Sequence, residues 1–249
     1  MGARVAVIIP CHSWPQYLPE ALDSVRRQTR PADTVILVLD CPPEPTLYRA
    51  ILAREEWLES VWLRENVGPA EARNRGMKSA LARGCEWVTF LDEDDLLHPR
   101  YLERMLQSSE WCPWASIHYC DWVWCGDRAG HTRVPEYSYE RLCAGPYIMS
   151  TSLIKTQVWL DVREKNGTGF DPALRGWEDY LFYLEAGALG HEGARVGLAL
   201  VKYRRHGGYS ISDETHAHLP RTVRYIRDKM QTLYGVRVTY QCPSDRRLN

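Results

Sequence analysis

The amino-acid sequence predicts an α/β fold in which a mostly parallel sheet is flanked by helices. The 249 residues are 45% hydrophobic and 25% charged, which is typical of an ordinary globular protein. Short apolar, β-branched runs alternate with amphipathic segments along the first hundred residues, and such alternation is the pattern of parallel βαβ units. No internal repeat or low-complexity tract interrupts the chain, so we expect one domain over residues 1–249.

The first predicted elements are a strand, a helix and a second strand. Residues 4–10 (RVAVIIP) are apolar and end at a proline, as a buried strand at a sheet edge does. Residues 17–28 place apolar side chains on one helical face, and residues 34–39 (TVILVL) form a second buried strand that stops at Asp40. This order predicts the opening of a parallel sheet.

The alternation then continues into an acidic cluster. The next predicted elements are a helix at 47–58, a strand at 61–63, a helix from Pro69 to about Gly84 and a strand at 86–91. The last strand runs directly into Asp92–Asp95. Because the carboxyl ends of parallel strands meet at one edge, we expect Pro10–Ser13, Asp40 and Asp92–Asp95 to line one crevice.

The second half of the chain has a different texture. Residues 111–150 are rich in Trp, Tyr and Cys, with turn signals at Gly126 and Gly130, which predicts a smaller region of short antiparallel strands. A helix at 178–189, a strand at 195–205 and a helix at 217–233 follow. We therefore divide the domain into a first half (1–97), a second half (98–215) and a C-terminal helix and tail (216–249).

Charge, apolar runs and cysteine spacing exclude several classes of protein. The formal net charge of −1 gives no global attraction to nucleic acid or anionic lipid. No apolar run approaches the roughly 18 residues needed to span a bilayer, and the N-terminus resembles no leader peptide, so we expect a cytoplasmic protein. The eight cysteines form no CxxC pair, which argues against a structural zinc site.

The acidic cluster DEDD indicates a metal site. Four carboxylates directly after a buried strand repel one another, and a divalent cation would relieve that repulsion. In extended chain Asp92 and Asp94 point to the same side, and carboxylate oxygens suit Mg²⁺ or Mn²⁺ shared with substrate phosphates. The alternative for an isolated DxD is a polar turn with a helix cap.

Four segments together resemble a known family. VAVIIPCHSWPQYLPEALDSVRRQT, RENVGPAEARNRGMKSALARGCEWVTFLDEDD, GFDPALRGWEDYLFYLEAGALG and YRRHGGYSIS occur between residue 4 and about residue 212, in this order. They are similar to the successive signatures of family 2 glycosyltransferases. The resemblance implies the GT-A fold, a Rossmann-like sheet that binds a nucleotide-diphospho-sugar in the first half and the acceptor in the second.

The resemblance implies a set of donor-binding residues in the first half. Pro10, Asp40 and Arg73 fall at the nucleotide pocket, and Asp92, Glu93 and Asp94 form the DXD motif that holds the metal and the donor. The paired acids usual in the family after the second strand are reduced to one, Asp40. For Arg73 the alternative is a surface arginine on a helix.

In the second half the resemblance implies the catalytic residues. Asp179 corresponds to the catalytic carboxylate and Glu178 to a neighbour that contacts the acceptor or orients the site. Trp177 is a candidate platform for the acceptor or the donor. The alternatives are an acid that stabilises the start of a helix, for Asp179, and a solvated glutamate, for Glu178.

The resemblance also implies that residues after the strand at 195–205 contribute to the donor site. His206 falls where a family histidine completes the metal shell or contacts the diphosphate, and Arg204 with Arg205 could bind diphosphate oxygens. Taken alone, a histidine is more often structural, and either arginine could face solvent.

The aromatic region and the tail allow two interpretations each. Trp111, Trp114, Trp122 and Trp124 could stack on sugar rings or bases, or pack in a core. From Pro220 to Asn249, six Arg and one Lys stand against two Asp. This excess is either a patch for phosphate-bearing acceptors, with Arg221, Arg224 and Arg227 on one helix face, or a solvated surface.

We therefore expect a metal-dependent, inverting glycosyltransferase that uses Mn²⁺ or Mg²⁺ and a nucleotide-diphospho-sugar, a UDP-sugar being favoured. The acceptor stays open among glycans, small molecules and modified nucleic acid such as modified DNA. One alternative is a sugar nucleotidyltransferase, but that class has a Gly-rich basic loop where this chain has PCHSWPQ. The other is a non-catalytic sugar-binding or nucleic-acid-binding module on the same fold.

Overall fold

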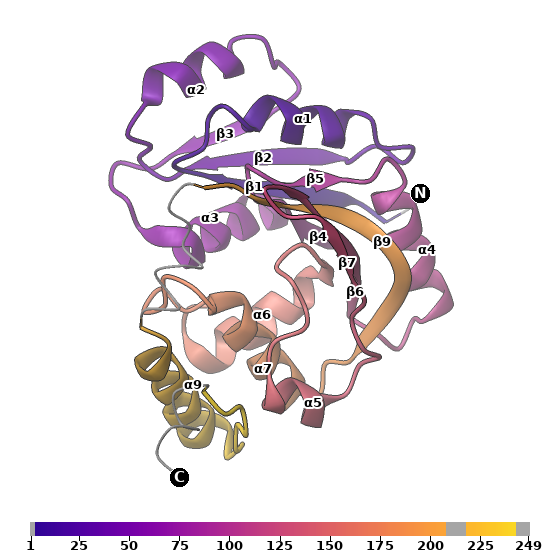
Figure 1. The fold of residues 1–249 in the computed structure, drawn as a ribbon, viewed down its shortest axis with the longest axis vertical. Helices are drawn as coiled ribbons and strands as arrows, with labels where there is room; N and C mark the ends of the chain where they lie inside the picture. Colours follow the sequence, from indigo (N-terminus) through magenta and orange to yellow (C-terminus); the bar gives the residue numbers. More distant parts are fainter. Residues whose placement is uncertain (1–2, 208–217, 243–249) are drawn as a thin grey trace.

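The computed structural model describes residues 3–207 and 218–242 (Figure 1). Its elements in chain order are β1 (Val5–Cys11), α1 (Leu18–Arg26), β2 (Thr34–Leu39), α2 (Pro45–Leu52), β3 (Glu59–Trp62), α3 (Gly68–Ala82), β4 (Trp87–Phe90), β5 (Leu96–Leu97), α4 (Tyr101–Trp111), β6 (Ile117–Gly126), β7 (Gly130–Thr132), α5 (Tyr139–Ala144), β8 (Leu153–Lys155), α6 (Thr156–Asn166), α7 (Glu178–Ala188), β9 (Gly193–Arg205) and α9 (Leu219–Tyr234). The alternation of strands and helices confirms the predicted α/β class.

One mixed sheet runs through the molecule in the order β3-β2-β1-β4-β8-β6-β9-β5, with β7 paired to β6. The first four strands in this order are all parallel, as the sequence predicts. β8 is antiparallel to β4 and to β6, and β6 is parallel to β9. The carboxyl ends of β1, β2, β4 and β6 therefore lie at the same edge of the sheet.

The sheet separates two hydrophobic cores because successive residues of a strand point to opposite faces. In β1, Val5, Val7 and Ile9 belong to the core under α1 and α4. Ala6 and Ile8 belong to the core under α3, α6 and α7, on the other side of the sheet (Figure 1). Both layers of helices are therefore fixed to the strands whose ends form the crevice.

The region 111–150 differs from the prediction of several short antiparallel strands. The turn signals Gly126 and Gly130 do join an antiparallel pair, β6 and β7. However, β6 is a long strand whose main partner is β9, in parallel, and helix α5 follows it. Local patterns could not reveal this pairing, because β6 and β9 are separated by three helices and two strands.

Helices α4 and α6 were also not predicted, and α2 ends at Leu52 rather than at residue 58.

The short strand β5 connects the acidic cluster to the far edge of the sheet. It pairs antiparallel with β9, Leu96 opposite Lys202 and Leu97 opposite Val201. The Asp95 carboxylate accepts a hydrogen bond of 2.8 Å from the backbone N–H of Arg204. The end of β9 is thereby held beside the residues that follow β4.

The C-terminal helix α9 is amphipathic and packs on the domain through Leu219, Val223, Ile226 and Met230. Arg221 and Arg224 on its outer face are exposed. The predicted start of this helix at 217, and the tail from 243, lie outside the described residues. Within residues 3–207 and 218–242, no helix combines the length and the apolar character needed to cross a bilayer.

Gly76 provides a test of how closely α3 packs on β1. A Cβ atom at this position would overlap Cγ2 of the buried Ile8. We expect Gly76→Ala to lower the free energy of unfolding by about 1–3 kcal/mol, because the clash outweighs the gain of about 1 kcal/mol in helix propensity. Urea denaturation measures the difference.

Gly197→Ala in β9 is the matched control. Its added Cβ would meet its nearest atom, Nη1 of Arg195, at an ordinary 3.5 Å. The control should stay within about 0.5 kcal/mol of the unsubstituted protein. Equal stability of the two variants would contradict the packing described here.

Candidate active site

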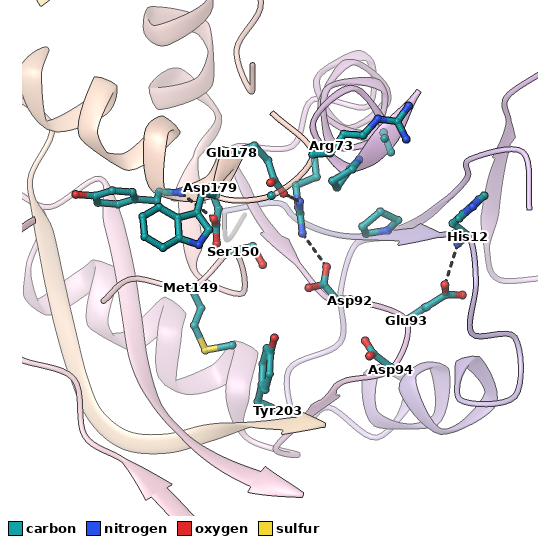
Figure 2. Close-up of a pocket in the computed structure, with 18 of the residues that line it drawn as sticks. His12, Arg73, Asp92, Glu93, Asp94, Met149, Ser150, Glu178, Asp179 and Tyr203 are labelled. Atoms are coloured by element: carbon teal, nitrogen blue, oxygen red, sulfur yellow. Dashed lines mark hydrogen bonds and ion pairs between the residues drawn. The ribbon is translucent and has the colours of Figure 1, made fainter. Parts of the chain in front are cut away.

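A cavity of about 640 Å³ opens at the carboxyl edge of the sheet (Figure 2). It is bounded by the segments after β1, β2 and β4, the start of α3, residues 146–150 and the start of α7. The predicted site residues that line it are Pro10, Asp40, Arg73, Asp92, Glu93, Asp94, Trp177, Glu178 and Asp179. The structure thus brings together side chains that come from both halves of the chain.

The buried Arg73 links the acidic cluster to the start of α7. Its Nη2 donates to Oδ1 of Asp92 at 2.8 Å, and its Nη1 forms an ion pair with Oε1 of Glu178. Burial would lower the pKa of Arg73, but the charges of Asp92 and Glu178 outweigh burial and raise it. The surface position considered for Arg73 is therefore wrong: the side chain crosses the site between two acids (Figure 2).

Glu93 holds the loop that follows β1. Its Oε1 accepts the backbone N–H groups of residues 12–14 at 2.8–3.0 Å, and its Oε2 accepts the hydroxyl of Tyr48 at 2.5 Å. Burial raises the pKa of Glu93, although these four hydrogen bonds oppose the rise. The middle residue of the predicted DXD motif therefore shapes the wall of the cavity, and its described contacts are to the protein itself.

Asp40 has a comparable role at the start of α3. Its two carboxylate oxygens accept the backbone N–H groups of Val67 and Gly68, each at 2.8 Å. His12 lies beside it, with Nδ1 2.7 Å from the carbonyl oxygen of Asp40 and Nε2 2.8 Å from the side-chain amide of Asn66. His12 belongs to the stretch expected to line the crevice, whereas Asn66 was not predicted, although it stands in a segment that carries the family resemblance.

Asp94 and His206 lie together as predicted for a metal site. Oδ2 of Asp94 is 3.1 Å from Nε2 of His206, and the rings of Trp14 and Tyr17 flank the imidazole at 4.2 and 5.1 Å. Burial, and then the charge of Asp92, raise the pKa of Asp94. Within the described residues no three His, Cys, Asp or Glu side chains form a group that could hold a metal ion, and Asp94 and His206 are a pair.

This pair fits a divalent cation that also binds substrate. Mg²⁺ and Mn²⁺ sites with nucleotide substrates commonly use one or two protein ligands and complete their coordination with phosphate oxygens. The mutual repulsion of Asp92 and Asp94 is the electrostatic reason for a cation here. The carboxylate of Asp94 is a ligand that suits both Mn²⁺ and Mg²⁺.

Arg204 is placed differently from the prediction of a donor contact. Its Nε donates to the carbonyl oxygen of Asp94 at 2.8 Å, its Nη2 donates to Glu20 at 2.6 Å, and its guanidinium stacks on Tyr17. It is not among the residues that line the cavity. Through its hydrogen bond to the Asp94 carbonyl oxygen, Arg204 stabilises the backbone of the acidic cluster.

Asp179 is the second residue of α7 and lines the cavity (Figure 2). Its Oδ1 accepts the backbone N–H of Tyr180 at 2.8 Å, as an acid at a helix start does. Burial raises the pKa of Asp179, and the positive charge of Arg73 partly offsets this rise. Its partner Glu178 is more deeply buried and is engaged by Arg73, so the two neighbouring acids have different surroundings.

Aromatic side chains cover the remaining wall. Trp122, Trp124, Tyr147 and Tyr203 line the cavity, together with Met149. Trp122 also packs against both hydrophobic cores, so it serves the core and the site together. Trp111 and Trp114 lie elsewhere, with 73% and 58% of their surface exposed, and neither the core nor the cavity includes them.

The chain is similar to known proteins in its sequence and in its fold. A protein of Haemophilus influenzae described as an uncharacterized glycosyltransferase is 30% identical over 195 residues, which cover 73% of this chain and 61% of that protein. This chain thus spans less than two thirds of that relative's length.

Two solved structures share the fold. The TarS protein of S. aureus in complex with UDP-GlcNAc matches with a TM-score of 0.76 at 21% identity, over 92% of this chain and 67% of that one. A mannosyltransferase of Pyrobaculum calidifontis, in complex with GDP-Man and Mn²⁺, matches with a TM-score of 0.59 at 18% identity, over 89% and 64%. The predicted GT-A fold is confirmed.

The family itself is identified by a sequence model. The model described as glycosyl transferase family 2 matches residues 6–138, more than half of the chain. This range runs from β1 through the acidic cluster to β7. It contains the lining residues Pro10, Asp40, Arg73 and Asp92–Asp94. The chain belongs to glycosyl transferase family 2.

Proposed function

We propose that the protein transfers a sugar from a nucleotide-diphospho-sugar, a UDP-sugar in particular, to an acceptor hydroxyl with inversion at the anomeric carbon. The observation that carries this proposal is that Asp92 and Asp94 of one half line the same cavity as Asp179 of the other. The UDP-GlcNAc bound by TarS supports the choice of nucleotide. In this proposal residues 1–97 bind the donor and residues 98–215 the acceptor.

The donor's diphosphate is assigned to the acidic end of the cavity. Asp94 and His206 would hold Mn²⁺ or Mg²⁺, with Asp92 beside them, and the Mn²⁺ of the Pyrobaculum structure supports this assignment. When bound, such a cation neutralises the charge that develops on a departing diphosphate. Pro10 and His12 line the neighbouring wall, where the nucleoside would lie.

Asp179 is our candidate for the general base. It takes the proton of the acceptor hydroxyl while that oxygen forms a bond to the anomeric carbon and the bond from this carbon to the diphosphate oxygen breaks. A single displacement of this kind inverts the anomeric centre. Glu178 is the poorer candidate, because the Arg73 guanidinium already binds its carboxylate.

Arg73 prepares the site without touching the reacting atoms in this assignment. Its two ion pairs fix the distance between the acidic cluster and the start of α7. Its positive charge also favours the ionised form of Asp179, which is the form a base requires. Arg73 is thus a positioning residue.

The acceptor wall suits an uncharged group. It is built from aromatic side chains and Met149, and Arg73 and Arg175 are the only Arg or Lys side chains among the described lining residues. Aromatic faces bind the apolar faces of sugar rings. A phosphate-bearing acceptor would have to reach the exposed Arg221 and Arg224 on α9, since Arg227 donates to the carbonyl oxygen of Tyr240.

The first prediction concerns the metal. Release of UDP from a UDP-sugar should stop in EDTA and return when Mn²⁺ or Mg²⁺ is added in excess. Asp94→Asn should weaken metal-dependent binding of UDP, measured by calorimetry with and without Mn²⁺, and leave the melting temperature nearly unchanged, because the substitution removes one of several repelling charges. Full activity in EDTA would refute the metal assignment.

The second prediction concerns the base. Asp179→Asn should reduce kcat for transfer by about 10² to 10⁴-fold, because the amide is nearly isosteric but cannot accept the proton. The dissociation constant for UDP should stay the same. Asp228→Asn, at an exposed site on α9, is the matched control and should retain full activity.

The assay also separates the alternative functions. A variant Asp179→Asn with normal turnover would reassign Asp179 to stabilising the start of α7. Release of pyrophosphate instead of UDP would indicate a nucleotidyltransferase. Binding of UDP-sugar without any turnover, under conditions with metal, would indicate a binding module.

A further inference from the structure

The C-terminal segment, residues 219–242, packs against the stretch of chain that leads into α7. Nζ of Lys229 lies 2.6 Å from Oδ2 of Asp171 and 3.2 Å from Oε1 of Glu185, and the Tyr225 hydroxyl donates to the same Asp171 oxygen at 2.7 Å. Asp171 and Glu185 are both buried. This network fixes the beginning of the stretch 171–177.

The other end of the stretch is held by rings. The indole of Trp177 makes an edge-to-face contact with Tyr240, with centroids 5.2 Å apart and planes at 72°. Trp177 and Tyr240 also pack on the small apolar cluster of Leu219, Val223 and Cys242. Residues 219–242 therefore hold both ends of this stretch. One end is Asp171, and the other is Trp177, which directly precedes Glu178 and Asp179.

Tyr240 is itself held firmly. The backbone N–H groups of Thr239 and Tyr240 donate to the carbonyl oxygen of Cys143, at the end of α5, at 2.8 and 3.0 Å. Arg227 of α9 donates to the carbonyl oxygen of Tyr240. The ring that meets Trp177 is thus fixed both to α5 and to α9.

Trp177 needs such support because its backbone is strained. Its φ of +64° and ψ of +12° lie in the left-handed region, which bulky side chains rarely adopt. Strained residues persist only where their surroundings over-determine them. Here the strained residue immediately precedes Glu178 and Asp179, so its conformation sets the direction in which α7 begins.

We propose that residues 219–242 are a working part of the active site, with Tyr240 as a positioning residue that keeps Trp177 in its left-handed conformation and thereby aims Asp179 into the cavity. The inference rests on the proposed function, because it assigns Asp179 as the base. Tyr240 touches no reacting atom and acts through Trp177.

The test compares Tyr240→Ala with Tyr240→Phe, using UDP release from UDP-GlcNAc, UDP-glucose and UDP-galactose in the presence of Mn²⁺. We expect Tyr240→Ala to lower kcat by about 10- to 100-fold, the size of effect that a small misplacement of a catalytic group produces. KM for the donor should change by less than about twofold, because the donor wall is untouched. Tyr240→Phe keeps the ring and should match the unsubstituted protein.

A second comparison shows whether Tyr240 acts through Asp179. If it does, Tyr240→Ala should cost no further activity in the Asp179→Asn background, because groups that act as one unit are not additive. Val223→Ala trims the cluster below Trp177 and should lower kcat in the same direction by a smaller factor. This variant decides the matter if Tyr240→Ala does not fold.

Three results would overturn the inference while leaving the proposed function intact. They are a Tyr240→Ala protein with unchanged kcat, a Tyr240→Phe protein as slow as Tyr240→Ala, and full additivity of Tyr240→Ala with Asp179→Asn. An unsubstituted protein that turns over none of the three donors would instead contradict the proposed function, and the inference would fall with it.

Discussion

One buried guanidinium organises this molecule's active site. Arg73 lies among Asp92, Glu178 and Asp179, and removing its charge would leave several carboxylates close together with little water to screen them. Two of these acids belong to the start of α7 and one follows β4, so Arg73 on α3 ties the segment after β4 to Glu178, which lies 105 residues further along the chain than Arg73. The relative position of the two cavity walls depends on this tie.

Other carboxylates in the site serve the backbone. Glu93 collects three consecutive N–H groups after β1, and Asp40 collects two at the start of α3. Loops at the end of a parallel sheet have few hydrogen bonds of their own, and a buried carboxylate can satisfy several donors at once. The cavity is therefore shaped by acids that we expected to contact the donor.

The sequence predicted the first half of the fold well, because its strands are short, apolar and bounded by clear stop signals. β1, β2 and β4 lie within a residue or so of the expected bounds. The middle of the chain was harder to predict, since β6 pairs mainly with β9, which lies far along the sequence. The local sequence of β6 does not indicate which strand it pairs with. Helices α4 and α6 were missed although their buried residues, Leu102 and Met105 in α4 and Val158 and Val162 in α6, follow helical spacing.

The sequence predicted which residues lie in the site better than it predicted what each of them does there. The resemblance named residues that the fold does bring together, including Asp94 beside His206. It could not tell which carboxylate would meet a backbone amide and which would face the cavity, because that choice depends on distances of an ångström or two. Tyr240 and Lys229 carried no motif, and their importance follows only from their contacts with Trp177 and Asp171.

The sheet divides the interior of the protein into two hydrophobic cores. Neighbouring residues of β1, such as Val7 and Ile8, pack in different cores, and no fully buried side chain in the described part of the chain belongs to both. Trp122 packs against both cores, so a substitution there acts on both layers of helices, whereas a volume change at Val7 acts first on the layer of α1 and α4. Substitutions in the core under α3 and α7 act directly on the helices that carry Arg73 and Asp179.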